Sequence, residues 1–261
     1  MNRRLKGAIR RLLPRSIGRH VILGGPLRGN LIVASWHDYP AAILGRTEIA
    51  LLNHFTQIVG KGETWLDIGA HFGYTAIALS KLVGPSGRVF AFEPMLSTAG
   101  SIARTRLLNN FPQLTVIPMA LANCQDLTID SLYSERGMID STLEEHTGFN
   151  ETFVAARLDW LWPRIGGTDL RIDGIKVDVQ GMEIQVLEGM TAVAKKWRPK
   201  LCVEIHKGVS RPSLLRVIAS MGYKTRALPI RPLPGETEPI YADDQTYEFI
   251  AETDDPTLRA L

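Results

Sequence analysis

The chain has 261 residues, of which 45% are hydrophobic, and this is enough to fill the core of one large domain. Its two cysteines, Cys124 and Cys202, are too few and too widely spaced to indicate a disulfide framework or a zinc site. No apolar run approaches the roughly 20 residues that span a bilayer, and no apolar segment typical of a secretory signal follows the basic N-terminus. We therefore expect a protein of the reducing cytoplasm.

The formal net charge of +3 is unevenly distributed along the chain. Eight basic residues precede the first acidic residue, Asp38, whereas the rest of the chain carries 22 basic and 27 acidic residues. Leu5, Ile9 and Leu12 repeat at helical spacing among these basic residues, until Pro14 interrupts the pattern. Residues 3–19 therefore fit peripheral contact with an anionic membrane, an organelle transit peptide, or a solvated arm that packs on the domain.

The remaining sequence reads as one domain. We predict a basic N-terminal extension over residues 1–45 and a single α/β domain over residues 46–261. No basic patch interleaved with aromatic residues recurs after the extension, so we do not expect nucleic-acid binding.

In chain order, the first predicted elements are short strands within residues 20–37 and a helix over residues 47–59. Strands and helices then alternate, which is typical of a Rossmann-like, doubly wound and mostly parallel sheet. A Pro-rich loop between the last two strands predicts an antiparallel hairpin at one edge of the sheet. The alternating elements are strands 64–68, 88–92, 114–118, 173–178, 200–205, 223–228 and 246–251, and helices 73–82, 96–110, 181–195 and 210–221.

Residues 123–157 interrupt this alternation, because they are polar and show little periodicity. A stretch of this length in an α/β domain predicts a lid or substrate loop rather than a simple connection. Trp160 and Trp162 follow it and would suit either stacking on a sugar ring or packing in the core.

A glycine turn is the first candidate site, in the segment Asp67-Ile-Gly-Ala-His-Phe-Gly-Tyr-Thr75, and the next strand ends at Glu93. Such a turn at the carboxyl end of a parallel strand holds adenosine-containing cofactors. Asp67 would repel a pyrophosphate but suits the ammonium group of S-adenosylmethionine. Gly69 would let the backbone approach the ligand, and Gly73 would let the next helix pack closely. Glu93 has the spacing of a residue that binds ribose hydroxyls. The alternative is an ordinary turn with incidental carboxylates.

Three further polar side chains are expected at the same edge of the sheet. Asp178 follows an apolar strand, and Glu204 and His206 lie two residues apart at the end of the next strand. A histidine beside carboxylates in this crevice is a candidate for acid–base chemistry. Glu183, in the following helix turn, is either part of the site or a charge that favours the helix dipole.

These motifs resemble those of the FkbM-type methyltransferases, a Rossmann-like class I family that uses S-adenosylmethionine. The resemblance covers about residues 64–207, and its motifs are weak singly but specific in this order. His71 stands where the family often has Asn, and Gln180 stands where Glu is usual, which counts against metal binding at that position. The matching segments are Asp67-Ile-Gly-Ala-His-Phe-Gly-Tyr-Thr75, Phe92-Glu-Pro94, Leu158-Asp159 with Leu161, Ile175-Lys-Val-Asp-Val-Gln-Gly-Met-Glu183, Val186-Leu-Glu-Gly189 and Pro199-Lys-Leu-Cys-Val-Glu-Ile-His206.

The resemblance implies an O-methyltransferase that acts on a hydroxyl of a sugar, glycolipid or polyketide-type natural product, with a small-molecule or lipid-linked saccharide as acceptor. His206 and Asp178 lead the candidates for the base that removes the hydroxyl proton, followed by Glu204. Mg²⁺ held by Asp178, Glu204 and water is an alternative to a base. The implied cofactor contacts are Asp67, Gly69, Ala70, Gly73 and Glu93, with the adenine against Ala120, Leu121 and Ala122.

Two other classes of protein remain open. A nicotinamide-dependent oxidoreductase would share the fold, but the lack of a Gly-x-Gly-x-x-Gly motif and the presence of Asp67 argue against it. A non-catalytic or membrane-recruited binding module would depend on residues 1–19 rather than on Asp178. Measurement of which cofactor the protein binds distinguishes a nicotinamide-dependent oxidoreductase from a methyltransferase.

Overall fold

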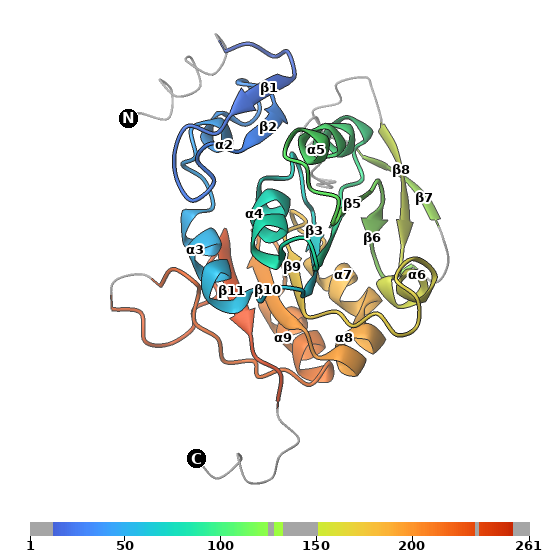
Figure 1. Ribbon diagram of the computed structural model, residues 1–261. Coiled ribbons are helices and arrows are strands. Elements are labelled where there is room, and N and C mark those ends of the chain that lie inside the picture. The colour runs from blue at the N-terminus through green and yellow to red at the C-terminus, as the bar shows by residue number, and fades with distance from the viewer. Residues whose placement is uncertain (1–12, 125–127, 133–150, 233–234, 253–261) are drawn as a thin grey trace.

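A six-stranded sheet forms the centre of the computed structural model, which describes residues 13–124, 128–132, 151–232 and 235–252 (Figure 1). Its strand order is β11-β10-β9-β3-β4-β5. Five strands are parallel, and β11 pairs antiparallel with β10, which confirms the predicted α/β sheet with an antiparallel edge. The strands are β3 (Thr64–Ile68), β4 (Arg88–Phe92), β5 (Leu114–Ile117), β9 (Gly174–Val177), β10 (Lys200–Ile205) and β11 (Gln245–Phe249).

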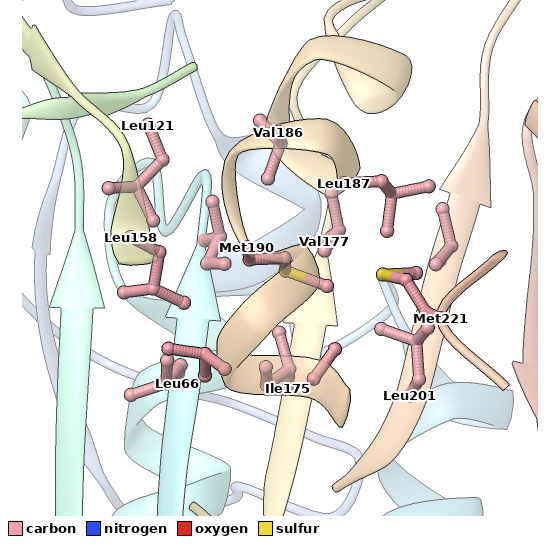
Figure 2. Close-up of a cluster of buried hydrophobic side chains, with 14 of the residues drawn as sticks. Leu66, Leu121, Leu158, Ile175, Val177, Val186, Leu187, Met190, Leu201 and Met221 are labelled. Carbon is pink, nitrogen blue, oxygen red and sulfur yellow. The ribbon is translucent and has the colours of Figure 1, made fainter. Parts of the chain in front are cut away.

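Helices cover both faces of this sheet because its central strands are apolar on both sides. On one face, Leu66, Ile175 and Leu201 pack beneath Val186 and Met190 (Figure 2). That face is covered by α6 (Leu158–Ile165), α7 (Glu183–Gly189), α8 (Thr191–Trp197) and α9 (Arg211–Ser220), and the other by α3 (Ile49–Ile58), α4 (Tyr74–Val83) and α5 (Leu96–Leu108).

Two predicted elements differ from the structure. The helix predicted over residues 181–195 is divided at Met190, whose backbone leaves the helical region. Just before it, a β-carbon on Gly189 would lie 2.1 Å from the carbonyl oxygen of Ala122, so the helix ends where it meets the backbone of residue 122. Residues 223–228 form no strand; among them only Tyr223 makes an isolated bridge, and β11 pairs with the free edge of β10 instead.

Two strands within the predicted loop over residues 123–157 belong to a separate three-stranded sheet. The strands β6 (Ala120–Leu121), β8 (Glu151–Ala156) and β7 (Thr128–Leu132) pair in that order. Phe153 and Ala155 of β8 are buried, so this part of the segment is held by packing. The sequence analysis did not predict these strands, and the role of this segment as a lid or substrate loop stays a prediction. Residues 125–127 and 133–150 lie outside the described residues.

The described part of the predicted N-terminal extension packs on the α/β core. The strands β1 (Gly18–Val21) and β2 (Leu31–Ala34) pair, and α2 (Pro40–Ile43) follows them. The amide of Val33 donates to Thr105 Oγ1 of α5 at 2.9 Å, and Ile32 joins a buried cluster with Ile77 of α4. The helix predicted around Leu5 lies outside the described residues. Within the described ranges, every helix is too short or too polar to span a bilayer.

Candidate functional site

A cavity of about 670 Å³ opens at the carboxyl ends of the parallel strands. Its wall is formed by the turn after β3, the segment after β4, the small sheet, the ends of β9 and β10, and part of the N-terminal segment. This is the place where sheets of this kind bind ligands. Of the predicted site residues, Gly69, Ala70, Glu93, Ala120, Leu121, Asp178 and Glu204 line the cavity, whereas Asp67, Gly73 and His206 do not.

The two glycines of the turn after β3 have left-handed backbone, and at Gly69 a protein contact also excludes a side chain. Gly69 has a φ of +81°, and a β-carbon there would lie 1.8 Å from the carbonyl oxygen of Asp178. Gly73 has a φ of +82° and precedes α4, where a β-carbon would press on Ile102 of α5. Gly73 thus faces α5, and its predicted role in packing the helix on the strand stays a prediction, whereas Gly69 allows the turn to approach the end of β9. Its predicted contact with a ligand stays a prediction.

Glu93 lies on the cavity wall and organises the turns around it. Its carboxylate accepts hydrogen bonds from the amide of His71 at 2.8 Å, the amide of Met95 at 3.0 Å and Thr98 Oγ1 at 2.8 Å. Burial raises the pKa of Glu93, although these hydrogen bonds oppose the shift. A carboxylate has about four lone-pair positions, so one remains for a hydroxyl group of a ligand.

Asp67 is fully buried behind the cavity wall. Its Oδ2 atom accepts a hydrogen bond of 2.6 Å from Thr75, and its Oδ1 atom lies 3.4 Å from Nζ of Lys176. The register of the sheet places Asp67 directly beside Lys176. Asp67 therefore meets a protein ammonium group, and this conformation offers no direct contact with the ammonium group of a ligand.

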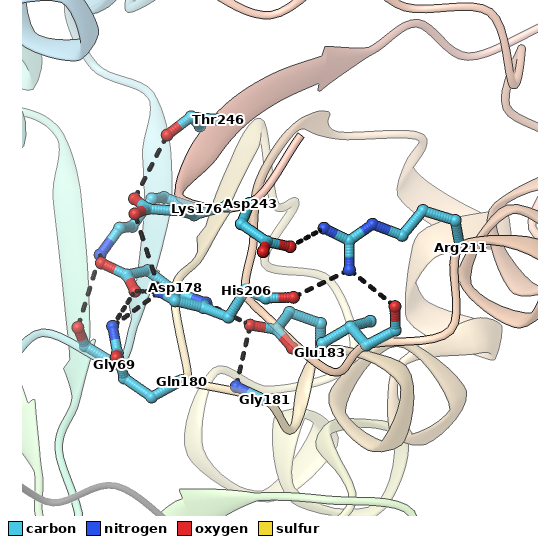
Figure 3. Close-up of polar contacts among 12 residues, drawn as sticks. Gly69, Lys176, Asp178, Gln180, Gly181, Glu183, His206, Arg211, Asp243 and Thr246 are labelled. Atoms are coloured by element: carbon cyan, nitrogen blue, oxygen red, sulfur yellow. Dashed lines mark hydrogen bonds and ion pairs between the residues drawn. The ribbon is translucent and has the colours of Figure 1, made fainter. Parts of the chain in front are cut away.

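Lys176 was not among the predicted site residues, yet it links the two halves of the site (Figure 3). Its side chain is 3% exposed, and Nζ lies 3.2 Å from Asp178 Oδ2 and donates to the carbonyl oxygen of Gly69 at 3.4 Å. Burial alone would lower the pKa of Lys176, but the charges of Asp178 and Asp67 raise it, so the ammonium is retained. The signal in the sequence is a lysine inside an apolar strand, which must be paired with an acid.

Asp178, Glu204 and His206 are close together, as the sequence predicts. His206 Nε2 lies 3.5 Å from Asp178 Oδ1 and 3.7 Å from Glu204 Oε1. Burial would raise the pKa of Asp178, but Lys176 and His206 hold it below its usual value. For Glu204, burial and the charge of Asp178 raise the pKa to about 7. The two carboxylates thus differ in basicity although they share one edge of the sheet.

His206 is held from behind by Glu183 (Figure 3). Glu183 is fully buried, and its Oε1 atom lies 2.6 Å from His206 Nδ1 and accepts from the amide of Gly181 at 3.1 Å. A carboxylate accepts hydrogen bonds only, so Nδ1 carries a proton. On the other side, Gln180 Nε2 donates to His206 Nε2 at 2.7 Å and separates the ring from the cavity. Glu183 is therefore part of the site.

Comparisons with known proteins show the family to which the chain belongs and known structures with a similar fold. A family model with the description Methyltransferase FkbM domain matches residues 67–225, more than half of the chain. No curated protein sequence matches the chain significantly. Among solved structures, the fold resembles a putative rRNA-methylase from Clostridium thermocellum, with 11% identity and a TM-score of 0.50 over 78% of this chain and 94% of that one.

Two further solved structures have lower TM-scores. One is an S-adenosylmethionine-dependent O-methyltransferase from Thermotoga maritima, with 13% identity and a TM-score of 0.47 over 86% of this chain and 74% of that one. The other is a methyltransferase FkbM from Methylobacillus flagellatus KT, with 14% identity and a TM-score of 0.46 over 76% of this chain and 50% of that one. This chain thus spans half the length of the Methylobacillus protein.

Proposed function

The chain belongs to the FkbM methyltransferase domain family, and from this we propose that it transfers a methyl group from S-adenosylmethionine to a hydroxyl of a sugar, glycolipid or polyketide-type natural product. One observation supports this proposal above the others. A single cavity joins the glycine turn and Glu93, on the cofactor side, to the carboxylates of Asp178 and Glu204, on the acceptor side.

The residues of the cofactor side fit an adenosine-containing ligand. Gly69 and Ala70 line the cavity at the end of β3, and Glu93 retains an acceptor position for a ribose hydroxyl. Ala120 and Leu121 form an apolar wall against which an adenine would lie. When bound there, S-adenosylmethionine supplies an activated methyl group, so the protein has to orient the acceptor and remove its proton.

Glu204 is the residue that we propose as the base. A general base works best when its pKa is near the working pH, and Glu204, with a pKa of about 7, meets this condition. Asp178 is less basic because it is paired with Lys176, and Gln180 separates His206 from the cavity. In this proposal the hydroxyl proton moves to the Glu204 carboxylate, while Lys176 keeps Asp178 ionised and His206 holds the position of Gln180.

Mg²⁺ fits this arrangement less well than a base does. Asp178, Glu204 and His206 offer ligand atoms within 4.8 Å of one another. However, the Lys176 ammonium is already 3.2 Å from Asp178, and one of the three groups is an imidazole, whereas Mg²⁺ prefers oxygen ligands. We expect that chelation of divalent ions with EDTA leaves methyl transfer unchanged. A loss of activity that Mg²⁺ restores would favour the metal instead.

The test of this proposal is methyl transfer from radiolabelled S-adenosylmethionine to a panel of hydroxylated acceptors, by the wild type and by Glu204→Gln. We expect kcat/KM of the wild type to rise with pH through about 7, because Glu204 acts in its ionised form. Glu204→Gln should lose this dependence and most of its turnover. The control is Glu238→Gln, since this glutamate is 70% exposed and does not line the cavity. Transfer to amine acceptors alone would contradict O-methylation.

We also propose that residues 3–19 bring the protein to an anionic membrane when the acceptor is lipid-linked. Ile17, at the end of this segment, lines the cavity, so a bound segment would hold the cavity mouth near the lipid surface. Sedimentation with vesicles of phosphatidylglycerol, compared with phosphatidylcholine, tests this idea. Equal binding of a chain that lacks residues 1–12 would contradict it.

A further inference from the structure

The N-terminal segment, here residues 17–48, supplies one wall of the cavity, although it precedes the region that the family model matches. Tyr39, Thr47 and Glu48 line the cavity from this segment. The segment is firmly held: the amide of Leu31 donates to Asn109 Oδ1 at 2.9 Å, and a β-carbon on Gly45 would lie 1.9 Å from the carbonyl oxygen of Gly24. This wall is therefore a fixed surface that an acceptor would meet.

Glu48 has an unusual backbone and an under-used carboxylate. Its φ is +53°, in the left-handed region that a glutamate adopts rarely, and α3 starts immediately after it. Among the described residues, its side chain accepts one long hydrogen bond, 3.4 Å from Thr47 Oγ1. A half-buried carboxylate on a cavity wall with this much free acceptor capacity points to a hydroxylated ligand.

The charges around Glu48 restrict what such a ligand can carry. Burial raises the pKa of Glu48, and the neighbouring charges of Lys176 and Asp178 act on it in opposite directions. Glu204 also interacts with Glu48, and the Lys176 ammonium acts on both of them and on Asp178. Near Glu48, an anionic methyl acceptor would meet charges of its own sign. The hydroxyl groups of a neutral substrate would instead find carboxylate oxygens to which they can donate hydrogen bonds.

Aromatic rings lie beside these carboxylates. Tyr39 meets His71 edge to face with ring centroids 4.9 Å apart, and Phe72 at 5.9 Å. Burial lowers the pKa of His71 to about 4, so its ring is neutral and adds to the apolar surface. An aromatic surface next to hydrogen-bond acceptors suits a ring that has one C–H face and polar edges.

We propose that Glu48 and Tyr39 form the acceptor subsite and select a neutral, ring-shaped polyol such as a saccharide over its anionic counterparts. This inference rests on the proposed function. Glu48 accepts hydrogen bonds from neighbouring hydroxyls of the acceptor, and Tyr39 contacts its apolar face. The acceptor lies between this pair and Glu204.

The experiment uses the full-length protein and three matched probes: a neutral methyl hexoside, the corresponding hexuronide and the hexose phosphate. We expect the wild type to methylate the neutral probe with a kcat/KM about tenfold or more above that of the anionic probes. Glu48→Gln should raise KM for the neutral probe about 10- to 100-fold. The ratio of kcat/KM for the neutral probe to kcat/KM for the anionic probes should therefore become smaller. Tyr39→Phe should retain most of the preference, because the ring remains.

Binding of S-adenosylhomocysteine, measured by calorimetry on each variant, separates this inference from the proposed function. Equal affinity in wild type and Glu48→Gln shows that the variant is folded and that the effect lies with the acceptor. An unchanged KM and preference in Glu48→Gln would overturn the inference, as would a wild type that binds S-adenosylhomocysteine but methylates none of the probes. If the wild type fails to bind S-adenosylhomocysteine, the proposed function fails and the inference with it.

Discussion

Replacement of Lys176 by methionine tests the charge arrangement at the centre of the site. The side chain keeps a similar length but loses the ammonium that lies 3.2 Å from Asp178 and 3.4 Å from Asp67. Asp67 is fully buried, so it finds no water to replace this cation. Lys176→Met therefore leaves a buried carboxylate without its partner.

The expected loss of stability follows from these distances. At an effective dielectric constant of about 20, each contact is worth roughly 5 kcal/mol, but desolvation of the buried charges offsets much of this. Breaking a buried ion pair on one side costs about 3–5 kcal/mol, which we take as the expected change. The control is Lys200→Met: Lys200 is 36% exposed where it pairs with Glu63, so about 1 kcal/mol or less is expected.

Urea unfolding at several pH values gives the decisive readout for Lys176→Met. In the wild type the pKa of Asp178 is lowered in the folded state. Its ionised carboxylate therefore stabilises the fold at pH values above the pKa of the unfolded chain, and this stabilisation is lost as the pH falls. Without the ammonium, burial raises the pKa of Asp178, and the folded variant gains a proton as the pH falls. The difference between the two proteins should thus shrink as the pH falls toward the ordinary titration range of an aspartate. A loss below about 1 kcal/mol, or one that does not change with pH, would refute this reasoning.

Three further predictions concern single residues. Glu93→Gln should weaken binding of S-adenosylhomocysteine about tenfold in calorimetry, because an amide nitrogen cannot accept a ribose hydroxyl; unchanged affinity would remove Glu93 from the cofactor site. Glu183→Gln should lower the pKa of His206, because burial lowers this pKa and the hydrogen bond to the Glu183 carboxylate raises it. NMR titration of the imidazole measures the change, and the same pKa in variant and wild type would contradict the prediction. Gly69→Ala should destabilise the fold by about 3 kcal/mol or more, because its β-carbon would overlap the Asp178 carbonyl; a wild-type melting temperature would show that the turn can move.

The sheet was predictable because its strands are short apolar runs bounded by turn residues. Strands β3, β4 and β10 agree with the predicted ranges, since burial on both faces leaves a clear apolar pattern. The pairing of β11 with β10 was not readable, because antiparallel partners far apart in sequence leave no local signal. The strands within 123–157 were missed for a related reason: β8 is stabilised by pairing with β6 and β7.

Part of the site followed from topology alone. Asp178, Glu204 and Glu93 could be placed at one edge because parallel strands end together. Lys176 was missed because its partner Asp67 comes from a different strand, and only the register shows that they meet. Tyr39 and Glu48 precede every motif, so no pattern in the sequence assigns them to the cavity. Trp162, which would suit a sugar, is instead buried against Phe90.

The central claim is that this cavity binds S-adenosylmethionine, and calorimetric titration of the full-length protein tests it most directly. Titration with S-adenosylhomocysteine and, in parallel, with NADH separates a methyltransferase from a nicotinamide-dependent oxidoreductase of similar fold. We predict micromolar binding of S-adenosylhomocysteine and no binding of NADH. Binding of NADH, or of neither ligand, would contradict the account.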